Sequence, residues 1–404
     1  MFTKRIKTHH SAMAEGKAYV TGVKNVQEVL TVNTTGSENA TIYIHVPFCN
    51  KICSFCNMRR SLKKPVEYYA DWIAAEIEQY GKLPYIKKTT FDAVFFGGGT
   101  PTTLGTAELQ KILKALRKNF KFTDNAEFTI ETTVTELTSE KLEVLVREGV
   151  NRFSVGVQTF DEAGRKVMGR IGSGEAAYEK LRELKSYDGV TVSMDLIYNY
   201  PGQTMESLYE DLDKIVELDL DGFSMYSLID MKETSISEAQ NEKNDEKMFF
   251  AISEYMQKAG YDFLELTKMV KRDAYKYIYN RHHGADTLPL GAGAGGFIGG
   301  VAIMNAIVLE EYEASVKNFS ERKGMHFRKE YKEVVKFKGA LQLLHLPENE
   351  ALYQQKEKYL EVVKMLMDEG MITFADGRYR MTTKGIFWGN TISRELSGLI
   401  FEVN

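Results

Sequence analysis

The three cysteines of this 404-residue chain lie within eight residues, at Cys49, Cys53 and Cys56, in the spacing C-x3-C-x2-C. They follow an apolar run, Ile42 to Phe48, which we predict to be a β-strand. Buried thiols are common in protein cores, but polar residues surround these three. A zinc site completed by His45 would favour C-x2-C pairs. Three thiolates with one open position are better suited to a four-iron cluster in which one iron has no protein ligand.

The composition is that of a globular protein and argues against several other classes. The net charge of −4 leaves no basic footprint for nucleic acid. No apolar run reaches the roughly 20 residues of a membrane span, and the N-terminal residues lack the apolar core of a signal peptide. Clustered cysteines fit a reducing compartment. We therefore expect a cytoplasmic protein that has no nucleic-acid partner and no membrane span.

Strand-like and helix-like stretches alternate from Thr41 onward. The predicted strands are Thr41–Pro47, Asp92–Phe96, Ala126–Glu131, Asn151–Val157, Val190–Tyr198 and Gly222–Leu228. The helices that follow them are Val66–Tyr80, Thr106–Asn119, Ser139–Glu148 (capped by Ser139), Glu175–Ser186, Met205–Glu217 and Asp245–Ala259. Six such units predict an α/β fold, a partial (β/α)6 TIM-like barrel, with a doubly wound sheet as the alternative. In both folds the functional groups lie at the carboxyl ends of the strands.

The chain divides into three predicted parts. Residues 1–40 are an N-terminal extension, in which Val20–Val32 forms a helix or a loose strand. Residues 41–305 form the barrel and end with a glycine-rich segment. Residues 306–404 contain helices followed by a hairpin around Asp376-Gly377. This pattern predicts a small, α-rich, winged-helix-like C-terminal domain.

Chemically distinctive residues stand at the ends of the predicted strands. Gly97–Gly99 and Thr100 follow the second strand, and three glycines are more than a turn needs, so we expect a backbone that approaches a ligand closely. Glu131 ends the third strand, where it serves a ligand or the N-terminus of a helix. Gln158 ends the fourth strand. Asp195 lies inside the apolar fifth strand, where a charge is costly without a partner.

The sequence HVPFC, the cysteine spacing and the GGGTP that follows the next strand resemble the radical S-adenosylmethionine (SAM) enzymes. HVPFC is more specifically similar to the branch that contains oxygen-independent coproporphyrinogen III oxidase. The resemblance covers about residues 41–300. It implies a [4Fe-4S] cluster held by Cys49, Cys53 and Cys56, with SAM bound to the free iron. An electron from the cluster would then cleave SAM to methionine and a 5′-deoxyadenosyl radical.

The resemblance implies SAM contacts along the strand ends, from Tyr43, Gly98, Gly99, Thr100, Glu131, Gln158, Arg170, Asp195 and Phe297. Tyr43 matches the aromatic position near the SAM methyl group. Arg170 matches a SAM-contacting arginine, although a solvated surface arginine is the alternative. Phe297 follows Gly291–Gly296, which matches GxGxxG. That segment follows no clear strand and lacks a well-spaced acidic partner, so we interpret it as a segment near the SAM adenine and not as a dinucleotide site.

His282 and His283 precede the glycine-rich segment. Paired histidines in a polar segment are usually solvated. We expect this segment to overhang the barrel mouth, however, where histidine would suit a haem iron or a tetrapyrrole propionate. The pair is therefore our candidate substrate site.

Within the branch, ADTLPLGAGAGGFIGG and WGNTISREL are most similar to the anaerobic haem-degrading radical SAM methyltransferases, the anaerobilin synthases. This resemblance implies that haem is opened to a methylated linear tetrapyrrole with release of iron. It also implies one or two SAM molecules and a low-potential electron donor such as a flavodoxin or ferredoxin. The alternatives are a coproporphyrinogen III oxidase-type dehydrogenase and a haem chaperone of the same branch.

Overall fold

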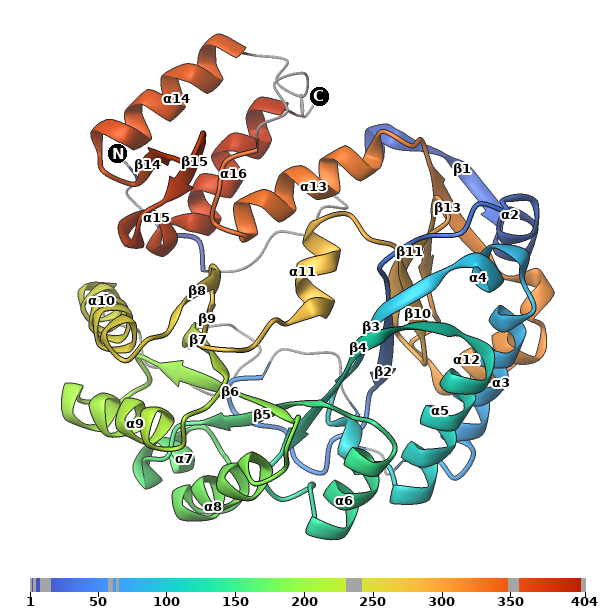
Figure 1. Ribbon diagram of the computed structural model, residues 1–404, viewed down its shortest axis with the longest axis horizontal. Helices are drawn as coiled ribbons and strands as arrows, with labels where there is room; N and C mark the ends of the chain where they lie inside the picture. The colour runs from blue at the N-terminus through green and yellow to red at the C-terminus, as the bar shows by residue number, and fades with distance from the viewer. Residues whose placement is uncertain are drawn as a thin grey trace.

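The computed structural model describes residues 2, 5–7, 16–56, 61–62, 65–229, 242–347 and 356–400. A curved sheet of thirteen strands dominates this part of the chain, in the order β1-β13-β12-β11-β10-β2-β3-β4-β5-β6-β7-β9-β8 (Figure 1). Six neighbouring strands run parallel, namely β2 (Ala40–Val46), β3 (Thr90–Gly98), β4 (Lys121–Thr133), β5 (Arg152–Gln158), β6 (Thr191–Tyr198) and β7 (Gly222–Ser227). The predicted partial (β/α)6 barrel is therefore confirmed.

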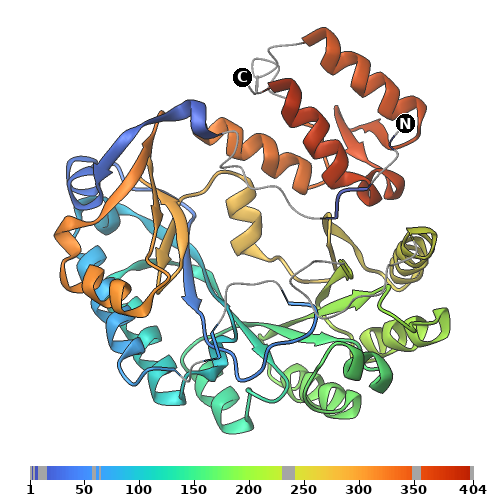
Figure 2. The ribbon, with the colours of Figure 1, turned by 180° about the vertical axis from the view of Figure 1, so that it is seen from behind.

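Helices cover the convex side of the sheet in both views (Figures 1 and 2). They are α3 (Tyr69–Gly81), α5 (Thr106–Asn119), α6 (Ser139–Arg147), α8 (Gly174–Lys185), α9 (Met205–Glu217) and α10 (Glu242–Lys258), with the shorter α4 (Pro84–Lys88) and α7 (Glu162–Val167). Each longer helix has an apolar stripe, as in α5, where Leu109, Ile112 and Leu116 are buried. The predicted cap of α6 was wrong by one residue: Thr138 accepts the backbone N–H of Lys141, and Ser139 is the first helical residue.

Strand alternation decides which side chains face the concave side. In β2, Ile42 and Ile44 are fully buried in the main core. Tyr43 lies between them and points the other way, where it packs on Phe95 of β3 and Tyr277. Tyr277 belongs to α11 (Lys276–His282), which Figures 1 and 2 show inside the curve of the sheet. The concave side is therefore filled by α11 in part.

The sheet continues beyond the six predicted strands on both sides. β10 (Thr287–Leu290) runs parallel beside β2, and β11 (Gly295–Ile298), β12 (Val301–Met304), β13 (Lys323–Phe327) and β1 (Val20–Asn25) follow as antiparallel strands. β9 (Lys268–Val270) and β8 (Asp262–Glu265) extend the other edge. Val20–Val32, predicted as a helix or a strand, contains one of each, because α2 (Val26–Val32) follows β1. The sheet thus crosses both expected boundaries, at residues 40 and 306, and the three-part division stays an expectation.

The C-terminal part has the predicted order of elements. After α12 (Leu309–Lys317) and β13 come α13 (Tyr331–Gln342), α14 (Lys356–Asp368), the hairpin of β14 (Ile372–Ala375) and β15 (Arg378–Met381), α15 (Thr383–Phe387) and α16 (Gly389–Ile400). The 3₁₀ segments are η1 (Lys17–Tyr19), η2 (Pro101–Thr103) and η3 (Phe319–Glu321). Residues 348–355, between α13 and α14, lie outside the described residues. Among the helices that are described, none has the length and apolar character that crossing a membrane requires.

Candidate functional site

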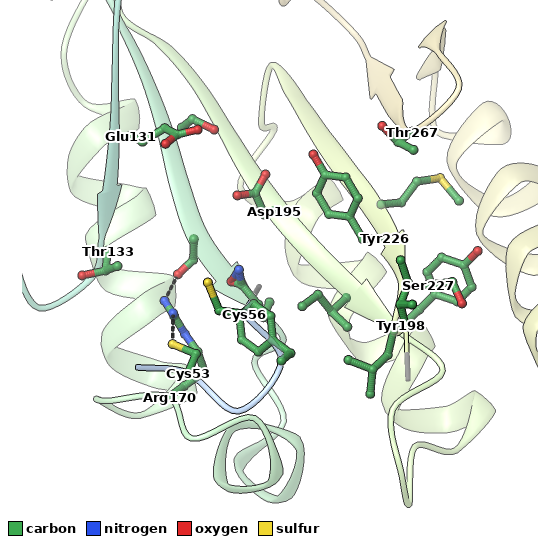
Figure 3. Close-up of a pocket in the computed structure, with 18 of the residues that line it drawn as sticks. Cys53, Cys56, Glu131, Thr133, Arg170, Asp195, Tyr198, Tyr226, Ser227 and Thr267 are labelled. Carbon is green, nitrogen blue, oxygen red and sulfur yellow. Dashed lines mark hydrogen bonds between the residues drawn. The ribbon is translucent and has the colours of Figure 1, made fainter. Parts of the chain in front are cut away.

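A cavity of about 700 Å³ lies at the carboxyl ends of the parallel strands. Figure 3 shows Cys53, Cys56 and Arg170 on one side of it and Tyr198, Tyr226 and Ser227 on the other, with Asp195 between them. The predicted residues that line it are Cys49, Cys53, Cys56, Gly98, Gly99, Thr100, Glu131, Gln158, Arg170 and Asp195. Parallel strands bring their carboxyl ends to one edge of a sheet, so residues far apart in sequence meet here.

The cysteine loop follows β2 and is held to the barrel by backbone hydrogen bonds. The N–H of Cys49 donates to the carbonyl of Ser61 at 2.9 Å, and the N–H of Ser61 donates to that of Pro47 at 2.7 Å. The N–H of Ser54 donates to the carbonyl of Met168 at 3.1 Å. All three cysteines are partly exposed on the cavity. Asn57, Arg59 and Arg60, which follow them in the sequence, lie outside the described residues.

The three thiols are not gathered around a single point. Among the described residues, no group of three His, Cys, Asp or Glu side chains is arranged to hold one metal ion. A [4Fe-4S] cluster takes each thiolate on a different iron, so its ligands stand farther apart than those of a single ion. The donor set of three thiols on one cavity therefore suits a cluster better than zinc.

Gly98 and Gly99 bring the end of β3 close to the cysteine loop. Gly98 has a φ of 115°, a region that favours glycine. A Cβ on Gly99 would lie 2.5 Å from the carbonyl oxygen of Phe48 and 2.9 Å from Cys49 Sγ. The next residue, Thr100, places its Oγ1 3.8 Å from Cys49 Sγ. This cradle leaves room beside Cys49 that any side chain at position 99 would fill.

Arg170 contacts the cysteine loop directly. Its Nη1 donates to Cys53 Sγ at 3.2 Å and its Nη2 donates to the carbonyl of Gly156 (Figure 3). Its Nε is buried and has no hydrogen-bond partner among the described residues. Arg170 is therefore not a solvated surface arginine, and its contact with SAM stays a prediction.

Glu131 and Asp195 form a pair of carboxyl groups beneath the cavity. Burial and the nearby charge of Asp195 raise the pKa of Glu131 to about 8, although the Gly98 N–H donates to Glu131 Oε2 at 3.3 Å. Burial also raises the pKa of Asp195, against the opposing effect of Lys268. A cationic group bound between these two carboxyl groups, such as an ammonium or sulfonium, would lower their pKa values and be held by their ionised forms.

Gln158 is held in an unusual backbone conformation at the end of β5. Its φ is 71°, and its buried Oε1 has no hydrogen-bond partner among the described residues. A strained residue with an unsatisfied polar atom on a cavity is typical of a ligand-binding position.

Tyr43, Phe297, His282 and His283 are not among the residues that line the cavity. Tyr43 lies deeper, with its hydroxyl 2.8 Å from His45 Nδ1. Phe297 packs on Phe327 and Tyr331 in the antiparallel part of the sheet, and its predicted place near the SAM adenine stays a prediction.

The histidine pair does not line the cavity. β10 runs parallel to β2, and its first residue, Thr287, pairs with Thr41. The residues just before β10 therefore stand at the amino ends of the strands, whereas Cys49 follows the carboxyl end. His282 Nε2 lies 3.2 Å from Glu265 Oε2, and His283 Nδ1 lies 2.8 Å from the carbonyl of Tyr279. A role of this pair at the substrate therefore has no support from the cavity lining and stays a prediction.

Both ends of the chain contribute residues that the sequence did not reveal. Arg5 and Lys7 line the cavity from the N-terminal side, and Phe387 and Asn390 from the C-terminal side. Asn390 lies in WGNTISREL, a segment that the resemblance singles out without giving a role to this residue. The roles of Arg5, Lys7 and Phe387 depend on contacts across more than 200 positions of sequence.

Residues 43–215 match the model of the radical SAM superfamily. This part of the chain, which contains the cysteine loop and the ends of β3 to β6, is a radical SAM domain. Proteins of this superfamily use a [4Fe-4S] cluster and SAM, in agreement with the cofactors that the sequence predicts.

Among curated proteins, the chain is 28% identical to anaerobilin synthase of Escherichia coli O157:H7, over 92% of this chain and 87% of that protein. It is also 28% identical to the heme chaperone HemW of Lactococcus lactis, over 87% and 95% of the two chains. The oxygen-independent coproporphyrinogen III oxidase of Escherichia coli K12 is 26% identical, over 68% and 65%. The fold resembles the solved structure of coproporphyrinogen III oxidase (HemN) from Escherichia coli, with a TM-score of 0.76 at 22% identity, over 91% and 92% of the chains.

Proposed function

We propose that this protein is a radical SAM methyltransferase that opens haem under anaerobic conditions to a methylated linear tetrapyrrole. The observation that carries the proposal is the cavity, which continues past the cysteine loop into an apolar half lined by Ile197, Met225, Leu228, Phe249 and Phe387. A large, flat, apolar substrate would fit beside the cofactors there. The similarity to anaerobilin synthase over 92% of the chain supports this choice.

The cofactors would be held by residues that already face the cavity. Cys49, Cys53 and Cys56 supply thiolates, and the backbone of Gly98 and Gly99 leaves space beside them. When bound, the cluster and SAM supply one-electron chemistry, the reductive cleavage of a carbon–sulfur bond of SAM. We expect Glu131 and Asp195 to bind the cationic groups of SAM, and Gln158 and the Arg170 Nε to bind its polar groups.

The chain's own residues also control what reaches the reacting carbon. Phe55 and Met225 line the cavity with apolar surface, which keeps water away from a substrate held between them. Tyr226 lines the cavity, is 40% exposed and presents a phenol, whose ordinary pKa is about 10. It therefore stays protonated and can donate a hydrogen bond to a tetrapyrrole. The cytoplasmic location and a flavodoxin or ferredoxin as electron donor are further proposals, which rest on the family resemblance.

An anaerobic assay tests the proposal. The full-length protein is reconstituted with iron and sulfide and then mixed with haem, SAM and a strong reductant. Loss of the Soret band, with a methylated open tetrapyrrole found by mass spectrometry, is the expected result. Cys53→Ala is the control, and it should lose the cluster absorbance and SAM cleavage together.

Two other outcomes would each select an alternative. Haem that stays bound and intact while SAM is not consumed would identify a haem chaperone, as in the relative HemW. Conversion of coproporphyrinogen to protoporphyrinogen in the same assay would identify an oxidase-type dehydrogenase.

A further inference from the structure

The end of the cavity away from the cysteines has a basic lining. Arg5 and Lys7 line this end, although they precede β1 by more than ten residues. They contact α10, β7 and α15. The Arg5 Nε donates to the carbonyl of Phe387 at 2.7 Å, and the Lys7 Nζ donates to Ser227 Oγ at 3.1 Å. The backbone N–H of Ile6 donates to Thr391 Oγ1 at 3.0 Å. These contacts fix both cations at the wall.

The positive charge at this wall exceeds the negative charge that balances it. Arg5 Nη1 and Lys7 Nζ lie 2.7 and 2.8 Å from the same atom, Asp245 Oδ2. Within the described residues, Asp245 is the only carboxylate that pairs with either cation. The two cationic side chains are only 16% and 18% exposed. Two partly desolvated cations against one carboxylate leave one positive charge, which favours an anionic ligand.

Apolar and aromatic groups surround this charge. The Arg5 guanidinium lies 4.0 Å from the centre of the Phe387 ring, so one of its faces is covered. Met225, Leu228 and Phe249 line the same cavity, and the centre of the Phe249 ring lies 5.8 Å from the Arg5 guanidinium. A ligand that satisfies both surfaces has an apolar body with an anionic group on one edge.

We propose that Arg5 and Lys7 form a carboxylate-binding subsite that holds the propionate edge of a tetrapyrrole and so turns the opposite edge toward the cysteine loop. The inference rests on the proposed function and adds the orientation of its substrate. A carboxylate on a second SAM molecule has the same chemistry, and the choice between the two is part of the test.

The test measures ligand binding to the full-length, cluster-loaded protein under anaerobic conditions. Lys7→Gln is the main variant, because Arg5 remains to balance Asp245 and the fold is kept. Haem and haem dimethyl ester, whose propionates are neutral, are titrated by the shift of the Soret band. Lys87→Gln, on the exposed side of α4, is the matched control.

We expect Lys7→Gln to weaken haem binding about tenfold and to leave binding of the ester and of SAM unchanged, with Lys87→Gln equal to wild type. Asp245→Asn, which removes the opposing charge, should bind haem more tightly. Equal weakening of haem and ester, or no weakening, would overturn the subsite. Weaker binding of SAM in place of haem would assign the carboxylate to SAM and overturn it too. Wild-type protein that binds no haem at all would instead overturn the proposed function.

Discussion

Arg170 shows how one side chain links two parts of the site. Its guanidinium donates to Cys53 Sγ at 3.2 Å and to the carbonyl of Gly156, which fixes the cysteine loop relative to β5. A hydrogen bond from a cation to a thiolate stabilises the more negative, reduced state of a bound cluster. We therefore propose that Arg170 positions the cysteine loop and would raise the electron affinity of a cluster bound there.

Replacing Arg170 with Gln should lower the reduction potential of the reconstituted cluster. A loss of about 1 kcal/mol of differential stabilisation corresponds to about 40 mV for one electron. An anaerobic redox titration followed by electron paramagnetic resonance measures the midpoint, and iron analysis confirms equal loading. Arg182→Gln, on the exposed face of α8, is the matched control. An unchanged midpoint in a fully loaded Arg170 variant would contradict this role.

Glu131 makes the stability of the cofactor-free protein depend on pH. The folded carboxyl keeps its proton up to about pH 8, whereas an unfolded glutamate loses it near its ordinary pKa of 4.5. Between these values the folded state binds more protons, so the free energy of unfolding falls as the pH rises. Glu131→Gln removes this contribution and keeps an acceptor for the Gly98 N–H.

We expect Glu131→Gln and wild type to be equally stable near the low end of this window. At about pH 8 the variant should be more stable by about 4 kcal/mol. Urea unfolding followed by circular dichroism at several pH values gives both curves. Parallel curves would show that the Glu131 carboxyl is ionised in the folded protein.

At the scale of elements, the site is built from the joints between strands and the segments after them. One of these connections, between β3 and η2, lies beside the cysteine loop. The N–H of Gly99 donates to the carbonyl of Val46 at 2.8 Å, and that of Thr100 to the carbonyl of Phe48 at 2.8 Å. These bonds tie the glycine turn to the start of the cysteine loop.

Gly99→Ala should prevent cluster assembly without unfolding the barrel. The new methyl group would lie 2.5 Å from the Phe48 carbonyl oxygen and 2.9 Å from Cys49 Sγ, so the backbone or the thiol must shift. We expect a stability loss of about 1–3 kcal/mol and a several-fold lower content of iron and sulfide after reconstitution. Gly398→Ala is the control, because a Cβ there meets no atom within 4 Å. Normal loading of the Gly99 variant would show that the cradle can relax.

The elements that sequence predicted well are those whose pattern is local. The helices α5 and α9 have the predicted limits, since their apolar stripes and polar flanks lie within one segment. β8 to β13 were missed, because strands of three to five residues carry too little periodicity. The direction of β10 decides where His282 lies, and only pairing with β2, some 240 residues earlier, sets that direction. The local sequence therefore could not show where the histidine pair lies relative to the cavity.

At the scale of the whole molecule, the candidate site needs both ends of the chain. The strand ends of the radical SAM domain supply the residues that sequence could find. Arg5, Lys7 and Phe387 form the end of the cavity away from the cysteines. Both cations pair with Asp245 of α10, and the Phe387 ring packs on Phe249 of the same helix. The topology of the chain brings these residues together. The sequence around each of them does not predict that position.

The N-terminal segment also belongs to the core of the sheet. β1 pairs with β13, and the N–H of Val26 donates to the carbonyl of Arg322 at 2.9 Å. Val26 and Leu30 of α2 are fully buried, and Leu30 Cδ2 fits against Gly299, where an added Cβ would come within 2.5 Å of it. Residues 20–32 should therefore unfold together with the barrel and not as a separate extension.

Leu30→Ala tests whether residues 20–32 unfold together with the barrel. It should lower the free energy of unfolding of the whole protein by about 3 kcal/mol, because it removes buried methyl groups and leaves a cavity beside Gly299. Val32→Ala, at the last residue of α2, is the matched control. Val32 is 83% exposed, so this substitution should change stability by less than about 0.5 kcal/mol. Urea unfolding monitored by circular dichroism and by tryptophan fluorescence should give one shared transition that moves in the Leu30 variant. If both variants match wild type, or if a small early transition alone moves, then α2 docks on the barrel as an independent unit and the predicted boundary at residue 40 is a true one.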